Sequence, residues 1–244
     1  MKLFAKLFVI VAAPLLLAGC LLIPGKFESQ LRLMNDGTYS FTYNGQMQLA
    51  SDNDKSMPPQ SGDSDEVGQK QSDPKRAAMS EIFGGAVPGD DEGLKKFAAQ
   101  LAKYDGWNKV EYVGDNLFEV EYAMSGNFDQ MFSFPTIPGA IMQFPFVQIV
   151  RRSGGELEIL TPAMAGQASL ASPMAPMMMG ASGSKESKMQ PIDGTFTIVT
   201  DGEVLVNNTQ DGLTVSGSTK NMRWKVDSTT GPDGSPRAII KLAK

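Results

Sequence analysis

Residues 31–49 read Leu-Arg-Leu-Met-Asn-Asp-Gly-Thr-Tyr-Ser-Phe-Thr-Tyr-Asn-Gly-Gln-Met-Gln-Leu, and this stretch decides the fold. Its apolar and polar side chains alternate, which is typical of strands with one buried face. A three-residue loop ending at Gly37 pairs the flanking residues, Leu33 with Tyr39 and Leu31 with Phe41. The same parity continues through Gly45 to Leu49. We therefore expect one long strand rather than a second hairpin at Asn44-Gly45.

Three more hairpins follow from the same alternation. Their turns lie at 114–116, 153–155 and 201–202, where Asp201-Gly202 is a strong two-residue turn signal. They are expected to pair Val110 and Tyr112 with Val120 and Phe118, Ile149 with Ile159, and Ile198 with Leu205. Two further strands are expected around 222–226 and 238–242.

One helix is predicted after Asp90 or Asp91, either of which can cap it. Its apolar face comprises Leu94, Phe97, Ala98 and Leu101, and Gly106 follows its end. Residues 75–83 are a second candidate for a short helix. Together these elements predict an α+β fold: a mostly antiparallel β-sheet of about eight or nine strands with one packed α-helix.

Two segments lack these patterns. Residues 51–76 hold almost no large apolar side chains and are expected to be a disordered insertion. Residues 163–191 are Ala, Gly, Ser, Pro and Met without periodicity, and are expected to be a flexible insertion. The second could separate a body at 27–162 from a C-terminal unit at 192–244. Because so short a unit makes a marginal core, we expect a single domain over 27–244.

The first 19 residues have the features of a secretory signal: Lys2 and Lys6, then a short apolar run. That run is too short for a transmembrane helix, which needs about 20 residues. Leu17-Ala18-Gly19-Cys20 matches the lipobox of bacterial lipoproteins. The resemblance implies cleavage before Cys20, a thioether-linked diacylglycerol on it, and a further acyl chain such as palmitate on the new amino terminus. The alternative is an ordinary secreted protein with a free cysteine.

This resemblance implies a protein that is lipid-anchored in the cell membrane or the outer membrane, on the periplasmic or extracytoplasmic side. Leu21 and Leu22 follow the cysteine without an Asp, which resembles an outer-membrane sorting signal. Residues 20–26 would then be a lipidated tether. The expected partners are the membrane, reached through lipid on Cys20, and a lipid ligand or an envelope protein.

Composition excludes several functions. Without Lys2 and Lys6, 20 basic residues face 27 acidic ones, and a chain of net charge about −7 without a basic cluster argues against nucleic-acid binding. There is no histidine, and the single cysteine belongs to the lipobox. Disulfides, Cys/His zinc sites and Ser-His-Asp or thiol catalysis are therefore excluded. No pair of carboxylates stands out, so we expect no enzyme, no cofactor and no metal site.

Residues 132–147, called here the apolar strip, hold four phenylalanines, three prolines and no charge. The prolines prevent a regular helix or a central strand. The strip either closes the core, lines a lipid-facing lip or pocket, or forms a patch for a partner protein. The candidate contacts with an apolar ligand or the membrane are Phe132, Phe134, Ile137, Ile141, Phe144 and Phe146.

Two other features have simpler explanations. The methionines between 174 and 179 are soft ligands for Cu(I), but the surrounding Ala, Ser and Gly favour a linker. The Asp-Gly pairs lack the spacing of a calcium loop and are more simply turns.

A lipidated cysteine, Asp36-Gly37-Thr38 between early strands, Gly106-Trp107 before a strand and a sheet-and-helix body resemble the mycobacterial LppM-type lipoprotein domain. This resemblance spans residues 21–160 and implies binding of envelope lipids; it assigns no residue a role. The sequence thus predicts a non-enzymatic, lipid-anchored envelope protein that binds a lipid or another apolar ligand. The alternative is an assembly lipoprotein of a membrane complex.

Overall fold

The computed structural model describes most of the chain beyond the predicted signal. The described ranges are 22–49, 84–128, 131–140, 145–165 and 190–243. Cys20, the predicted insertion at 51–76, the candidate helix at 75–83 and most of the predicted insertion at 163–191 lie outside them.

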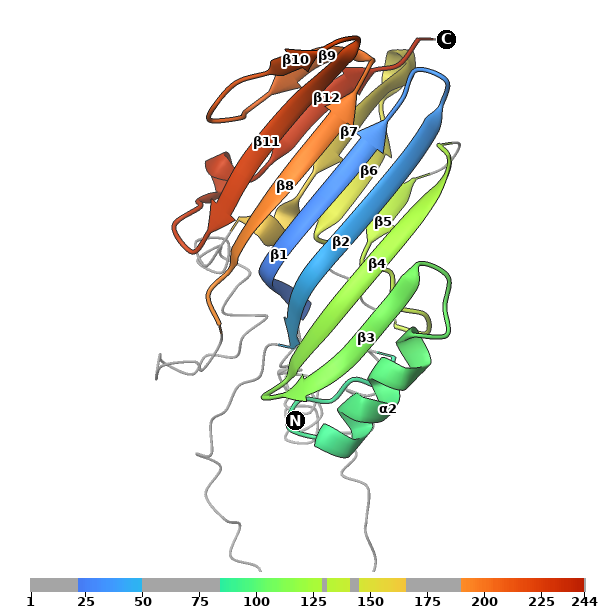
Figure 1. The fold of residues 1–244 in the computed structure, drawn as a ribbon, viewed down its shortest axis with the longest axis vertical. Coiled ribbons are helices and arrows are strands. Elements are labelled where there is room, and N and C mark those ends of the chain that lie inside the picture. Colours follow the sequence, from blue (N-terminus) through green and yellow to red (C-terminus); the bar gives the residue numbers. More distant parts are fainter. Residues whose placement is uncertain (1–21, 50–83, 129–130, 141–144, 166–189, 244) are drawn as a thin grey trace, which may run out of the picture.

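Twelve strands in two sheets and one α-helix make up the described part of the chain (Figure 1). This confirms the predicted fold class, with more strands than expected and a second sheet. The larger sheet has the order β10-β11-β8-β1-β2-β4-β3, and the smaller has β5-β6-β7-β12-β9. The elements are β1 (Leu22–Leu33), β2 (Thr38–Leu49), α2 (Asp91–Leu101), β3 (Trp107–Gly114), β4 (Leu117–Asn127), β5 (Phe132–Phe134), β6 (Val147–Arg151), β7 (Glu156–Leu160), β8 (Asp193–Thr200), β9 (Glu203–Asn207), β10 (Thr214–Ser216), β11 (Thr219–Asp227) and β12 (Arg237–Lys241).

The first hairpin has the predicted register. Leu33 pairs with Tyr39, Leu31 pairs with Phe41, and β2 runs unbroken through Gly45 to its end. β1 begins at Leu22, within the segment expected to be a tether, because Leu22 already pairs with the end of β2. A β-bulge between Pro24 and Phe27 interrupts this pairing opposite Gly45.

Two other predicted hairpins are confirmed. β3 and β4 pair across the turn at 114–116, and β6 and β7 pair across 153–155. The paired residues are Val110 with Val120, Tyr112 with Phe118, and Ile149 with Ile159.

The predicted hairpin at Asp201-Gly202 is wrong. β8 lies in the larger sheet between β1 and β11, while β9 pairs with β12 in the smaller sheet. Both hydrogen-bonding edges of β8 are therefore occupied, so Ile198 has no free edge for Leu205. At the corner, the Asn35 backbone N–H donates to the Asp201 carboxylate at 2.7 Å, and the chain passes from one sheet to the other.

The C-terminal strands belong to both sheets. β8 pairs with β1 in parallel, from Lys26 opposite Asp193 to Leu33 opposite Thr200, and β11 extends the same sheet. β12 pairs with β7 in the smaller sheet. Met164, at the start of the predicted second insertion, is fully buried, so the core extends slightly into that segment.

The helix and the smaller sheet cover the same face of the larger sheet. Along β4, Phe118, Val120 and Tyr122 share this face because alternate residues of a strand point the same way. The ring of Phe97 in α2 lies 5.8 Å from the Phe118 ring, and the ring of Phe134 in β5 lies 4.6 Å from the Tyr122 ring. The core therefore lies between the larger sheet and a second layer made of α2 and the smaller sheet.

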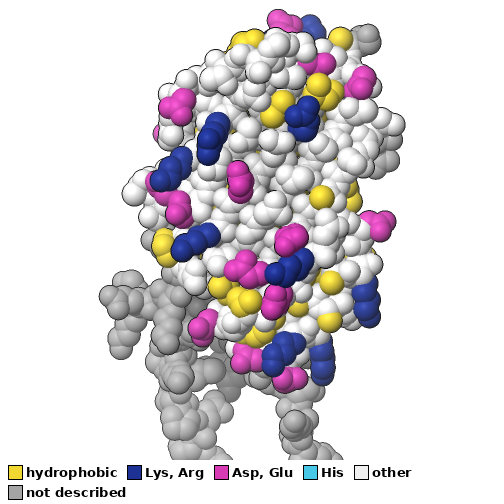
Figure 2. Space-filling view, in the orientation of Figure 1, with side chains coloured by type: hydrophobic (Ala, Val, Ile, Leu, Met, Phe, Trp, Pro, Cys, Tyr) yellow, Lys and Arg dark blue, Asp and Glu magenta, His cyan; other side chains and the backbone are white. Residues whose placement is uncertain are grey.

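The opposite face of the larger sheet is polar. Glu119 and Glu121 lie on it, as the alternation predicts. Figure 2 shows basic and acidic side chains interspersed over this side of the molecule, with hydrophobic atoms in small, separate areas. The described residues therefore form no extended apolar surface on this face.

Replacing Gly45 with alanine is expected to destabilise the fold strongly. Gly45 has φ +150°, and an added Cβ would lie 2.2 Å from the Lys26 carbonyl oxygen. Gly37→Ala is the matched control, because Gly37 has φ +83° but open space around an added Cβ. We expect Gly37→Ala to lower the free energy of unfolding by about 1 kcal/mol and Gly45→Ala by about 3 kcal/mol or more. Urea unfolding measures both, and equal losses would contradict the close approach of β1 and β2.

Candidate functional site

The structure buries every described candidate of the apolar strip. Phe132 is 6 % exposed, Ile137 is 8 % exposed, and Phe134 and Phe146 are not exposed at all. The first three residues of the strip form the edge strand β5, which ends immediately before Pro135. Ile141, Phe144 and the lipidation candidate Cys20 lie outside the described residues. For the four described residues, burial favours closure of the core, and contact with a ligand stays a prediction.

Phe134 is the centre of an aromatic cluster between the two layers. The centroids of the surrounding rings lie between 4.6 and 5.9 Å from its own; they belong to Phe41, Tyr43, Trp107, Tyr122 and Phe146. These tilted and edge-on arrangements are those that aromatic rings favour. Phe134 therefore joins the edge of the smaller sheet to β2, β3 and β4.

The strip also contacts the segment that leads to the helix. A Cβ added at Gly84 would lie 3.0 Å from the Pro138 carbonyl oxygen and 3.2 Å from the Ile137 side chain. Gly84 has φ +65°, a conformation that favours glycine. Residues 84–85 thus lie between the strip and α2.

Capping and one apolar face explain why α2 forms here. The Asp90 side chain accepts a hydrogen bond from the Gly93 backbone N–H at 3.1 Å, as an N-cap should, and Asp91 and Glu92 place negative charge in the first turn. The predicted face of Leu94, Phe97, Ala98 and Leu101 is buried.

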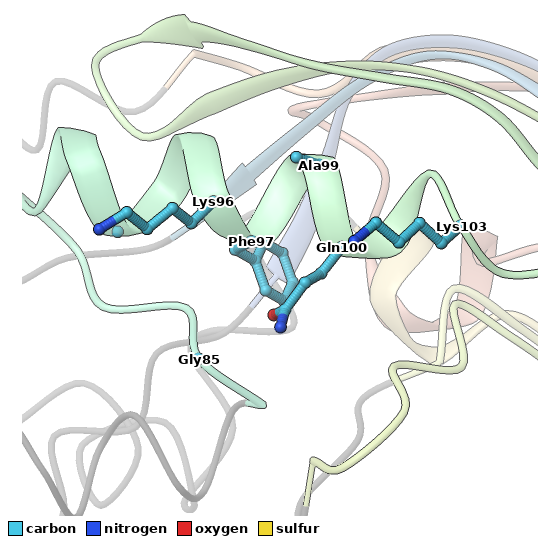
Figure 3. A pocket seen from close by; sticks show the side chains of 7 residues that line it. Gly85, Lys96, Phe97, Ala99, Gln100 and Lys103 are labelled. Carbon is cyan, nitrogen blue, oxygen red and sulfur yellow. The ribbon is translucent and has the colours of Figure 1, made fainter.

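A groove of about 480 Å³ runs along α2 beside this face. It is lined by Gly85, Gly93, Lys96, Phe97, Ala99, Gln100 and Lys103. In Figure 3, Phe97 and Gln100 point from the helix toward the side where Gly85 lies, while Lys96 and Lys103 extend along the helix. The groove therefore combines an aromatic wall with two ammonium groups and one amide.

The two lysines of the groove have no carboxylate partner among the described residues. Within the described residues, no Asp or Glu oxygen lies within 4 Å of the Lys96 or Lys103 ammonium, whereas neighbouring Lys95 lies 3.2 Å from Glu92. Lys96 and Gln100 are four residues apart on one side of α2, and Lys103 follows just after the end of the helix and lines the same groove. Seven residues separate the lysines by about 10 Å along the axis. This spacing suits an extended or branched anionic group.

Sequence reasoning missed this groove. The spacing of Lys96, Gln100 and Lys103 was visible, but exposed lysines on a helix most often do no more than keep it soluble. What distinguishes them is the neighbouring segment at 84–85, and its position depends on contacts with the strip.

Four of the exposed large apolar side chains lie on or beside two edge strands. They are Leu205 and Val206 on β9, and Val215 on β10 with Leu213 just before it. The alternative function in assembly stays a prediction.

The described residues contain neither a metal-binding cluster nor a membrane-spanning helix. Among the residues described, no three His, Cys, Asp or Glu side chains lie close enough together to hold a metal ion. In the same ranges no helix is both long and apolar enough to cross a membrane.

Stability is expected to fall at alkaline pH through the tyrosines around Phe134. Burial raises the pKa of Tyr122 to about 12 and raises the pKa of Tyr43 well above 10. The unfolded chain, with tyrosine pKa values of about 10, then loses protons first. The stabilisation by Tyr122 is complete below pH 10 and disappears as the pH rises to about 12. Urea unfolding at several pH values measures this effect. Between pH 10 and 12, the free energy of unfolding should fall less for Tyr122→Phe than for the parent. An equal fall in both proteins would contradict the role of Tyr122.

Comparison with known proteins gives little further information. No family model and no curated protein matches the chain. Among solved structures, the chain is similar to the folded domain of LppM from Mycobacterium tuberculosis, determined by NMR. The identity is 14 %, the TM-score is 0.34, and the match covers 93 % of this chain and 92 % of that one. The solved domain is of the type that the sequence resembles, but a likeness at this level decides neither the fold nor the function.

Proposed function

We propose that this protein is a lipid-anchored protein of the bacterial cell envelope that binds an anionic amphiphile in the groove along α2. The observation that carries the proposal is the pair of groove lysines, Lys96 and Lys103, beside the buried ring of Phe97. Neither lysine has a carboxylate within 4 Å among the described residues. The lipobox ending at Cys20 supplies the anchor.

The chemistry of the groove suits a molecule with one charged and one apolar end. A phosphate or carboxylate headgroup accepts charge-assisted hydrogen bonds from Lys96 and Lys103, and the Gln100 amide adds a neutral donor. An acyl chain then contacts Phe97 and Ala99, where burial of each methylene contributes about 0.8 kcal/mol. A lipid with a phosphate headgroup has both parts.

Binding rather than catalysis is proposed because of the groups that line the groove. Two lysines, one amide, one phenylalanine, one alanine and two glycines provide charge and apolar contact. Among the described residues that line the groove, no carboxylate is present to act with a lysine as an acid–base pair.

Reversing the charge of the groove lysines is expected to weaken binding of an anionic lipid. The soluble mature chain with Cys20→Ser is titrated with a fluorescent short-chain phosphatidylglycerol below its micelle concentration. We expect the variant Lys96→Glu/Lys103→Glu to raise the Kd at least about tenfold, because one charge-assisted hydrogen bond contributes about 1.5–3 kcal/mol. The affinity of the parent should also fall as salt is added.

Lys95→Glu is the matched control. Lys95 lies on the same helix, pairs with Glu92 and does not line the groove. It should leave the Kd within about twofold of the parent, because exposed ion pairs contribute little. Equal weakening by both sets of changes would show that net charge alone, not the groove, governs binding.

The anchor is tested separately in cells. We expect the parent protein to fractionate with membranes and to carry the mass of a diacylglycerol and an acyl chain on Cys20. Cys20→Ser should move the protein to the soluble periplasmic fraction, because the acyl chains provide the membrane affinity. A parent of unmodified mass, or a variant that stays with the membrane, would contradict the proposed anchor.

A further inference from the structure

The fold begins immediately after the predicted lipid attachment site. β1 starts at Leu22, which is 8 % exposed and pairs with Leu49 of β2. Cys20 precedes Leu22 by two residues, and two residues of chain reach at most about 7 Å. An anchor with a flexible spacer would allow the domain to tumble above the membrane; here no length for such a spacer remains.

The end of the molecule that holds Leu22, called here the anchor end, is built by five neighbouring segments. Beside Leu22 lie the end of β2, the β3–β4 turn at 113–117, the start of α2 and Gln190. The Leu49 backbone N–H donates to the Asn116 carbonyl, the Gly89 N–H donates to the Asn116 side chain at 2.8 Å, and the Gln190 N–H donates to the Gln48 side chain at 2.8 Å. These bonds join the neighbouring segments of the anchor end.

We propose that the domain is seated directly on the bilayer by its anchor end, with β1 leading away from the membrane. The inference rests on lipidation of Cys20, which is part of the proposed function. β1 has 12 residues and spans about 40 Å, so the β1–β2 turn at Asn35 lies far from the lipid. The β10–β11 turn at 217–218 lies at that far end too, because Lys220 pairs with Thr200 and Thr200 with Leu33.

The position of the groove relative to the membrane follows from the same orientation of the domain. The hydrogen bond between Gly89 and Asn116, and the one donated by the Tyr112 hydroxyl to Asp91, hold the start of α2 at the anchor end. α2 rises from there over about 15 Å and carries the lining residues between 93 and 100, with Lys103 just beyond its end. The groove therefore lies near the headgroups, where a lipid of the bilayer enters it without crossing water.

The carboxylates of the anchor end do not hold the domain in this position. Exposed Asp91, Glu92 and Asp115 lie at or near the anchor end, and an acidic surface is repelled by anionic lipids. The short covalent connection must impose the orientation. The seating is therefore expected to survive high salt, unlike an electrostatic contact.

Two single-cysteine variants of the lipidated mature protein test the orientation. Val113→Cys places a thiol at the anchor end, where Val113 is 48 % exposed, and Ser218→Cys places one in the exposed far turn. The Cys20 sulfur is held in a thioether, so the introduced thiol alone takes a fluorophore. Each labelled protein is reconstituted in vesicles of phosphatidylethanolamine and phosphatidylglycerol that contain a nitroxide-headgroup lipid.

We expect quenching at position 113 to exceed that at position 218 at least about threefold, at low and at high salt, because strands about 30–40 Å long separate the two ends. A 12-residue Gly/Ser spacer inserted after Cys20 should remove the difference, since it restores free rotation.

Equal quenching without the spacer, in protein that sediments with the vesicles, would overturn the proposed orientation while leaving the anchor and the groove intact. Failure to sediment would overturn the anchor and the seating together. Binding by the soluble Cys20→Ser chain tests the groove independently.

Discussion

The inner face of the seven-stranded sheet has to be covered along its whole width, and the rest of the structure follows from that requirement. The five-stranded sheet covers part of this face, and α2 covers the part formed by β3 and β4. The apolar strip fills the junction between them, where Phe134 contacts rings from three strands of the larger sheet. A buried aromatic ring contributes large apolar area, so this junction stabilises both halves of the second layer. The groove lies along α2, between the helix and the segment at Gly85.

Local pattern predicted the hairpins because both partners of each pair lie within a few residues of the same turn. Alternation and one left-handed glycine were enough to place Leu31 opposite Phe41. The corner at Asp201-Gly202 carries the same local signal but forms no hairpin, since β1 and β11 already occupy both edges of β8. Competition for a strand edge is decided by the whole sheet. For the same reason the sequence did not reveal a second sheet or the parallel pairing of β1 with β8.

The candidate site was predicted only in part. Uncharged composition singled out the strip, and proline at 135 correctly excluded a long central strand, but composition does not distinguish a buried strip from one that contacts lipid. The sequence did not single out the groove lysines, because their role depends on the residues that lie opposite them in the folded structure. Gly84 lies against Pro138 and Ile137, which are more than fifty positions away in the chain. A binding surface assembled by such contacts requires the folded structure.

The parallel pairing of β1 with β8 sets an order of folding events for a chain that is synthesised from its amino terminus. Leu31 pairs with Phe41, ten residues later, and with Ile198, 167 residues later. The hairpin of β1 and β2 can close early, but the other edge of β1 stays open until β8 has been synthesised. Such distant closure folds slowly, and an open strand edge invites pairing with other chains. The free edge of β1 therefore needs protection while the rest of the chain is made, and a chaperone that shields strand edges would act on it at this stage.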